Sequence, residues 1–237
     1  MRQVFHTFPW VHPEEPQEIQ AIYAKHGHLR RIKKGEILKN SYEHNQLFFL
    51  RKGLCAYYIN FYMDKPRVLS LIVPGRVMGD ITCITKDRVN VTVRAMRDSE
   101  FLSISPQYLL DEVSRDKDKV FLLMQSVIRK QESHLEGMIA NFLLMPEQRL
   151  QALIKTLLLT YKNAVVDGWN ILPLVLSHEE YGEITNITRV SVSRIFSRWK
   201  QDGMMMSHGR TLQVHSRLFE GLYDWLSDYQ KDYHCTA

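Results

Sequence analysis

The chain has 237 residues, of which 45% are hydrophobic and 24% charged, and its formal net charge is +5 at pH 7. A chain of this length is long for one hydrophobic core and suits two domains. The composition is that of a folded globular protein and excludes extensive disorder. By itself, so small a net charge does not identify a polyanionic partner.

The cysteines and the apolar runs bear on where the protein works. Cys55, Cys83 and Cys235 lie far apart, with no CxxC pair. This spacing argues for a reducing compartment, and against a disulfide framework or a cysteine-based metal cluster. No apolar run approaches the roughly 18 residues of a membrane span, and residues 1–10 lack the apolar core of a targeting segment. We therefore expect a cytoplasmic protein without a membrane partner.

Short apolar and β-branched runs fill the region from about residue 29 to residue 104. Turn signals separate them at Lys34-Gly35, Lys52-Gly53, Lys65-Pro66, Pro74-Gly75 and Asp98-Ser99. Val91, Val93 and Ala95 alternate with polar residues, as in a strand with one buried face. The pattern predicts a barrel or a double-sheet roll.

After Ser105-Pro106 the pattern becomes helical and continues to about Lys162, with an interruption at Pro146. One reading of the apolar stripe is a core helix packed under the roll. The other, which we favour, is a coiled coil with a second copy. The seam predicted for that pairing consists of Val120, Leu123, Val127, Gln131, His134, Leu135, Met138 and Phe142.

Pro146 predicts a hinge, because proline ends or kinks a helix. The expected domains are a β-roll with a helical lead-in over residues 1–105, a long helix with its hinge over 106–145 and a C-terminal domain over 146–216. Residues 217–237 form a C-terminal extension, where apolar spacing from Arg217 to Tyr229 predicts a helix.

A helix-turn-helix pattern begins at Ser177, where Ser177 and Glu180 form the S-x-x-E arrangement of a capping box. Asn186 suits the turn, and Thr188 suits the cap of a second helix that reaches about Gln201. Gly203 ends this helix, and Met204 to Val214 reads as a hairpin that turns near Arg210. The order of these elements predicts a winged helix-turn-helix.

The second helix suits double-stranded DNA. Arginines near the start of a recognition helix can donate two hydrogen bonds to guanine, and hydroxyls reach phosphates or bases. From residue 188 to residue 217 the sequence holds six cations and one anion. The alternative, solvated charges on a surface helix, leaves the order of the motifs unexplained. The predicted DNA-binding residues are Ser177, Arg189, Val190, Ser191, Ser193, Arg194, Arg198 and Arg210.

The chain resembles the cyclic-AMP receptor protein / FNR superfamily of bacterial regulators. The resemblance spans about residues 29–216. Its motifs are Phe48 to Gly53, Pro74 to Asp80 with Val93-Arg94-Ala95, and Leu176 to Val214. It implies an α+β fold in which a cyclic-nucleotide-binding-like jelly-roll is joined by a long dimerisation helix to a winged helix-turn-helix.

The resemblance also implies a homodimer on a palindromic operator, with RNA polymerase as a further partner. Family members usually read each half-site with an arginine, a glutamate and a second arginine. Arg189 and Arg194 match the arginines, but Val190 stands at the glutamate position. Valine cannot accept a hydrogen bond from cytosine, so the operator is expected to depart from the family consensus.

The residues of the expected effector pocket differ from those of family members that bind cyclic nucleotides. Family members that bind cyclic nucleotides use an Arg-Ser pair and a Glu after a Gly, whereas this chain has Val89, Asn90 and Asp80 after Gly79 at those places. Arg88 lies one residue before the position of the family's arginine. The candidate pocket residues are therefore Gly79, Asp80, Arg88, Val89, Asn90 and His134. We expect cyclic AMP not to bind tightly, because a buried phosphate needs a cation. The N-terminal cysteine cluster of an iron-sulfur centre is absent, and no histidine spacing favours haem or another metal.

Two other classes of function compete with a regulator that binds DNA. A ligand-binding signalling or protein-interaction module that does not bind DNA directly is the alternative. An enzyme is not expected, because no nucleophile with a base, metal-ligand spacing or phosphate-cradling loop is found.

Overall fold

The computed structural model describes residues 3–39, 45–59, 67–87, 89–161, 165–209 and 211–222. The chain divides into two compact units. One unit is His12–His134, and the other joins Met1–Val11 to Leu135–Ala237. Among the described residues, no helix combines the length and the apolar character that crossing a bilayer requires.

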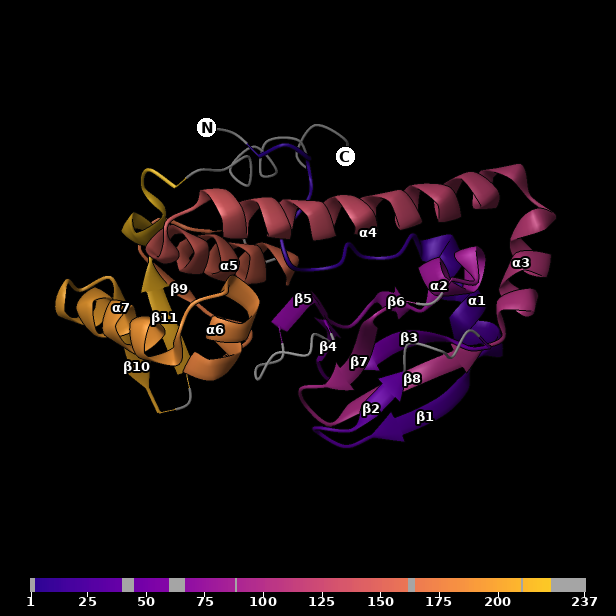
Figure 1. Cartoon of the computed structure of the whole chain (residues 1–237), viewed down its shortest axis with the longest axis horizontal. Helices are drawn as coiled ribbons and strands as arrows, with labels where there is room; N and C mark the ends of the chain where they lie inside the picture. Colours follow the sequence, from indigo (N-terminus) through magenta and orange to yellow (C-terminus); the bar gives the residue numbers. More distant parts are fainter. Residues whose placement is uncertain are drawn as a thin grey trace. The chain divides into compact units, whose positions relative to one another are not determined.

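Two antiparallel sheets make up most of the first unit, which confirms the predicted roll (Figure 1). One sheet has the order β1-β8-β3-β6 and the other has the order β2-β7-β4-β5. The strands are β1 His28–Ile32, β2 Ile37–Lys39, β3 Leu47–Lys52, β4 Cys55–Ile59, β5 Arg67–Ile72, β6 Arg76–Met78, β7 Val91–Ala95 and β8 Ser99–Ile104.

Alternating apolar side chains close the roll. Phe48, Leu50 and Phe101 are buried in one core cluster of the first unit. The turn after β3 depends on Gly53, whose φ is +105°. A Cβ there would lie 2.6 Å from the carbonyl oxygen of Asp98. Only glycine tolerates both conditions, which explains the Lys52-Gly53 turn signal in the sequence.

Helices accompany the roll: α1 Gln17–His26, α2 Asp80–Thr85, α3 Pro106–Ser114 and α4 Lys117–Leu143. The single helical segment expected before Pro146 is therefore divided at residues 115–116, which corrects the prediction. The carboxylate of Asp116 accepts a hydrogen bond from the backbone N–H of Asp118, as a cap does. The second helix, α4, has 27 residues and is about 40 Å long.

The second unit contains α5 Pro146–Thr160, β9 Trp169–Ile171, α6 His178–Thr185, α7 Arg189–Gln201, β10 Met205–His208, β11 Thr211–His215 and a 3₁₀ turn at Ser216–Phe219. Its sheet has the order β10-β11-β9. Pro146 is the first residue of α5, where its missing N–H costs nothing. Most of the helix predicted from Arg217 to Tyr229 lies outside the described residues, and the part within them is the 3₁₀ turn.

Candidate nucleic-acid interface

The capping box of α6 is confirmed. The hydroxyl of Ser177 accepts the backbone N–H of Glu180 at 3.2 Å, and the carboxylate of Glu180 accepts the backbone N–H of Ser177 at 2.7 Å. These bonds fix the first turn of α6. The hydroxyl of Ser177 is therefore engaged within the helix, although the residue is exposed.

The turn between α6 and α7 brings the two helices together. Asn186 adopts the left-handed conformation with φ of 56°, as its place in the turn predicts. A Cβ on Gly182 would collide with the carbonyl oxygen of Ile187, so only glycine permits this approach. The aromatic rings of Tyr181 and Phe196 then pack 5.0 Å apart across the two helices.

The start of α7 carries the exposed face that the sequence predicts. Thr188 caps the helix by accepting the backbone N–H of Ser191 at 3.1 Å. Arg189, Val190 and Arg194 are all exposed, and 59% of Val190 is accessible. Since Val190 and Arg194 are four residues apart, they lie on the same face of the helix. This face can offer a guanidinium and an apolar group together to one ligand.

Serines on α7 differ in what they can contact. The Ser191 hydroxyl lies 2.9 Å from the Thr188 hydroxyl within the cap, and Ser193 is half-buried. Ser197 is exposed one turn after Arg194, on the face that Val190 and Arg194 share. The sequence prediction did not include Ser197, although the helical period from Val190 would have found it.

Arg198 has a partner inside this unit. Its guanidinium donates to the carboxylate of Glu147 on α5, and the indole N–H of Trp199 donates to the same carboxylate at 2.6 Å. Glu147 therefore joins α5 to α7. Arg198 is exposed, but its charge is paired with the carboxylate of Glu147.

Strands β10 and β11 form the wing hairpin, which confirms this element. The turn uses Gly209 with φ of +58°. On the helix side, the ammonium of Lys200 donates to the hydroxyl of Ser207 at 3.5 Å. Arg210, the residue predicted at the tip, lies outside the described residues.

Two of the predicted effector-pocket residues lie in one buried cluster of the first unit. Asp80 is 2% exposed, and its carboxylate accepts a hydrogen bond from Lys130 of α4 at 2.5 Å. Lys130 also forms an ion pair with Glu15. We call Glu15, Asp80 and Lys130 the ionic cluster. His134 interacts electrostatically with Asp80 and Lys130 of this cluster.

His134 lies at the centre of a second set of contacts. Its Nε2 atom is 2.7 Å from Nε2 of His12 and 3.0 Å from the hydroxyl of Ser70. Burial lowers the pKa of His134 to about 4. Burial, with the positive charges nearby, also lowers the pKa of His12 well below its usual value. Both rings are therefore neutral at neutral pH.

The remaining pocket residues are placed differently. Gly79 is buried beside the cluster, and its N–H donates to the hydroxyl of Tyr57 at 3.4 Å. Val89 is half-buried and Asn90 is exposed, and both lie just before β7. Arg88 lies outside the described residues.

The sequence prediction missed the main charged members of this site, Glu15 and Lys130. A signal for Lys130 was present, since it falls on the inward face of α4 with Leu123, Ser126 and Ser133. A lysine on an otherwise buried face needs a carboxylate partner. Glu15 carried no comparable signal. Glu14 and Glu15 are adjacent and of the same type, and nothing in the sequence says which of them is buried.

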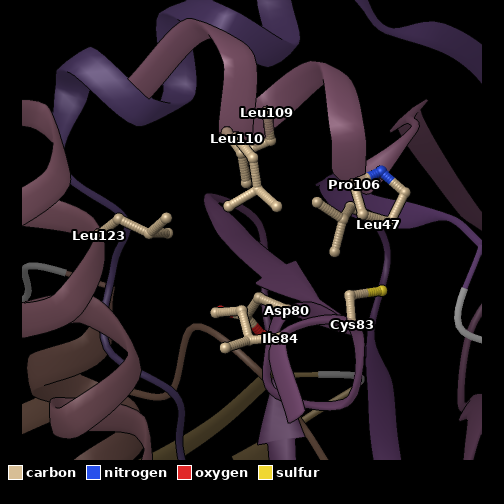
Figure 2. Close-up of a pocket in the computed structure, with 8 residues that line it drawn as sticks. All are labelled: Leu47, Asp80, Cys83, Ile84, Pro106, Leu109, Leu110 and Leu123. Atoms are coloured by element: carbon tan, nitrogen blue, oxygen red, sulfur yellow. The ribbon is translucent and has the colours of Figure 1, made fainter. Parts of the chain in front are cut away.

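A hollow of about 240 Å³ opens beside the cluster, lined by Leu47, Asp80, Cys83, Ile84, Pro106, Leu109, Leu110 and Leu123. In Figure 2, Leu109 and Leu110 point across it towards Asp80 and Ile84. This volume includes space that is open to solvent, so the enclosed part is far below the roughly 300 Å³ of the smaller ligand pockets. The hollow is small and almost wholly apolar, so we assign it no ligand.

The surface of α4 corrects the predicted seam. Leu123 is 7% exposed and belongs to the roll's core, and Val127 packs against that core. His134 is taken up by His12 and Ser70. Leu123, Val127 and His134 therefore face the roll and not a second copy of the chain. The prediction joined them to residues of a second, exposed stripe on the same helix.

The stripe that α4 leaves exposed follows steps of three and four residues, as a coiled-coil seam does. Val120, on the N-terminal turn of α4, lies beside this stripe and is 36% exposed. The stripe contains the predicted Gln131, Leu135, Met138 and Phe142, and adds Phe121, Met124 and Ile128. We call Phe121, Met124, Ile128, Gln131, Leu135, Met138 and Phe142 the α4 seam.

Two family models match the chain. The model for the cyclic nucleotide-binding domain matches residues 29–116, and the model for the Crp-like helix-turn-helix domain matches residues 139–219. Together they span more than half of the chain. None of the curated proteins compared with the sequence matches it.

Several solved structures share the fold. FixK2 from Bradyrhizobium japonicum has a TM-score of 0.71 at 16% identity, over 84% of this chain and 98% of its own. A mutant of CooA from Carboxydothermus hydrogenoformans has a TM-score of 0.67 at 17% identity, over 92% and 91%. The c-di-GMP responsive regulator CLP of Xanthomonas campestris has a TM-score of 0.65 at 18% identity, over 85% and 100%.

Proposed function

We propose that this chain, a DNA-binding transcription regulator of the CRP/FNR superfamily, binds a palindromic operator as a homodimer. The observation that supports base reading is the exposed start of α7. There Arg189, Val190 and Arg194 are all exposed and project from a helix whose start is fixed by the Thr188 cap. Such a helix inserts its N-terminal residues into the major groove.

Pairing through the α4 seam is the second part of the proposal. In one copy of the chain, Met124 and Ile128 are 54% exposed, Met138 is 58% exposed and Phe142 is 86% exposed. An apolar stripe of this length on one helix is a surface that a second copy would bury. Two-fold pairing would then present one recognition helix to each half-site.

The effector proposal follows from the pocket residues, which do not fit a cyclic nucleotide. Val89 and Asn90 supply no cation for the phosphate, and Asp80 is occupied by Lys130. We therefore propose that cyclic AMP is not the effector. Iron-sulfur and haem ligation are not part of the proposal either. Burial raises the pKa of the Cys55 thiol to about 12, which disfavours the thiolate that binds metals.

The partners follow from this function. Contact with RNA polymerase is proposed on the family resemblance alone. We propose a cytoplasmic location, which suits a protein that reads DNA and agrees with the widely spaced cysteines. We propose no catalytic activity, because binding and positioning account for the site described above.

A salt titration with duplex DNA tests this function against a module that binds only proteins or small ligands. The logarithm of the binding constant is expected to fall linearly with the logarithm of the salt concentration, with a slope of about −0.9 per phosphate neutralised. Fluorescence anisotropy of a labelled duplex gives this slope. Absence of binding at low salt, with the protein folded and dimeric, would favour the interaction module.

A further inference from the structure

Residues 12–15 lie along the chain that connects β5 to β6. The backbone N–H of His12 donates to the carbonyl of Leu71 at 3.1 Å, and that of Glu15 donates to the carbonyl of Gly75 at 3.0 Å. The guanidinium of Arg76 donates to the carbonyl of His12 at 3.0 Å. The segment before α1 is thus held as a part of the roll.

The carboxylate of Glu15 lies among donors from two elements. Its Oε1 atom accepts the backbone N–H of Val77 at 3.1 Å, and its Oε2 atom accepts the hydroxyl of Ser126 at 2.5 Å. It also pairs with the ammonium of Lys130, and its side chain is 1% exposed. An amide, a hydroxyl and an ammonium that converge on one carboxylate form an anion-binding site.

The charges at this site balance. Two acidic residues, Glu15 and Asp80, are buried with two basic residues, Lys130 and Arg76, and none of the four is more than 6% exposed. Burial alone would lower the pKa of Lys130, but the two carboxylates raise it above its usual value, so the ammonium stays charged. The rings of His12 and His134 also face the cluster, and both are neutral at neutral pH. The phenols of Tyr23 and Tyr57 interact with its two carboxylates, and burial raises the pKa of each. A further anion would be buried without a cation unless Glu15 left.

We propose that the roll contains a carboxylate-binding site, formed by the Val77 amide, the Ser126 hydroxyl and the Lys130 ammonium, and that Glu15 fills it as a built-in ligand. A free carboxylate enters this site only when residues 12–15 withdraw. Ser126 and Lys130 belong to α4, so withdrawal removes contacts from the helix that carries the α4 seam. The regulatory consequence rests on the proposed function, whereas the site itself does not.

Substitution of Glu15 with alanine tests the site in the full-length protein. Glu15→Ala is expected to lower the melting temperature by on the order of 10 °C, because Lys130 loses one of its two buried partners. Sodium acetate should then raise the melting temperature of this variant along a saturating curve, as a ligand does. Sodium chloride at the same ionic strength should not.

The neighbouring Glu14→Ala variant is the matched control, since Glu14 is exposed. Acetate and chloride should change the melting temperature of Glu14→Ala equally, and the same holds for the unaltered protein. Sodium phosphate added to Glu15→Ala distinguishes a carboxylate site from a general oxyanion site, and a phosphate response equal to the acetate response would overturn the carboxylate assignment. Equal responses of Glu15→Ala to acetate and chloride would overturn the site. If Glu15→Ala is recovered only unfolded, its refolding yield in acetate and in chloride gives the same comparison.

DNA binding by the same variants tests the regulatory consequence separately. Glu15→Ala is expected to change duplex affinity, and acetate is expected to restore it, whereas Glu14→Ala should leave affinity unchanged. If Glu15→Ala leaves the duplex affinity unchanged while acetate still raises its melting temperature, the carboxylate site is supported and its regulatory role is overturned. If neither the variants nor the unaltered protein binds DNA, the result contradicts the proposed function instead.

Discussion

Val190 stands at the start of α7 with 59% of its surface accessible, next to Arg189 and on the face of Arg194. An exposed valine contributes nothing to the core of its own domain. On a helix that enters the major groove, its methyl groups can contact the methyl group of thymine. The pair formed by Val190 and Arg194 therefore predicts a half-site with thymine where the family pattern has a cytosine partner for glutamate.

Arg194→Ala is expected to weaken operator binding by about 1–3 kcal/mol and to relax base preference, because a bidentate guanidinium contact to guanine is lost. Binding to the operator and to a scrambled duplex of equal length measures both effects. Lys200→Ala is the control, since this side chain already donates to Ser207 within the unit and should affect both duplexes equally. An unchanged ratio of the two affinities in Arg194→Ala would remove Arg194 from the reading residues.

The histidine pair predicts a loss of stability in acid. The folded state keeps the pKa of His134 at about 4 and that of His12 low, whereas the unfolded chain takes up protons below about pH 6.5. Stability is therefore complete above this value and decreases as the pH falls from about 6.5 towards 4. The slope is at most about 1.4 kcal/mol per pH unit for each histidine.

Urea unfolding at a series of pH values measures this slope. His134→Gln removes one titrating ring, keeps a polar side chain beside Ser70 and should reduce the slope. His28→Gln, at an exposed position of β1, should not. If His134→Gln and the unaltered protein show the same slope, these histidines do not cause the acid sensitivity.

At the scale of elements, local signals predicted α6 and α7 well. The cap at Ser177, the turn at Asn186 and the cap at Thr188 each depend on residues within a few positions, which the sequence displays directly. The stripe on α4 was predicted less well. Periodicity identifies an apolar stripe, but it does not say whether the roll or a partner covers it, and α4 has one stripe for each.

Ile128→Asp is expected to convert the dimer to a monomer while each chain stays folded. Ile128 is 54% exposed in one copy, so the aspartate meets water in the monomer but lies in the seam of a dimer. Sedimentation measures the mass, and circular dichroism checks the fold. Val127→Asp is the contrasting variant, because its neighbours belong to the roll's core and it should destabilise the fold itself. A folded Ile128→Asp dimer would place the pairing surface elsewhere.

At the scale of the whole molecule, the order of the two domains could be read from the sequence, because turn signals, helical period and Pro146 mark each change of pattern. The ionic cluster could not. Glu15, Asp80 and Lys130 are far apart in the chain, and although the helical period places Lys130 on a buried face, it does not identify the carboxylates that pair with it. Contacts of this kind depend on tertiary packing, which a single sequence does not display.

The central claim is that two copies of the chain read the two halves of a symmetric site. Selection of duplexes from a random pool by the purified full-length protein, followed by sequencing, tests it most directly. We expect a two-fold symmetric motif whose half-sites are centred about 10 base pairs, one turn of DNA, apart. Enrichment of an asymmetric sequence, or no enrichment by a protein that is folded and dimeric, would contradict it.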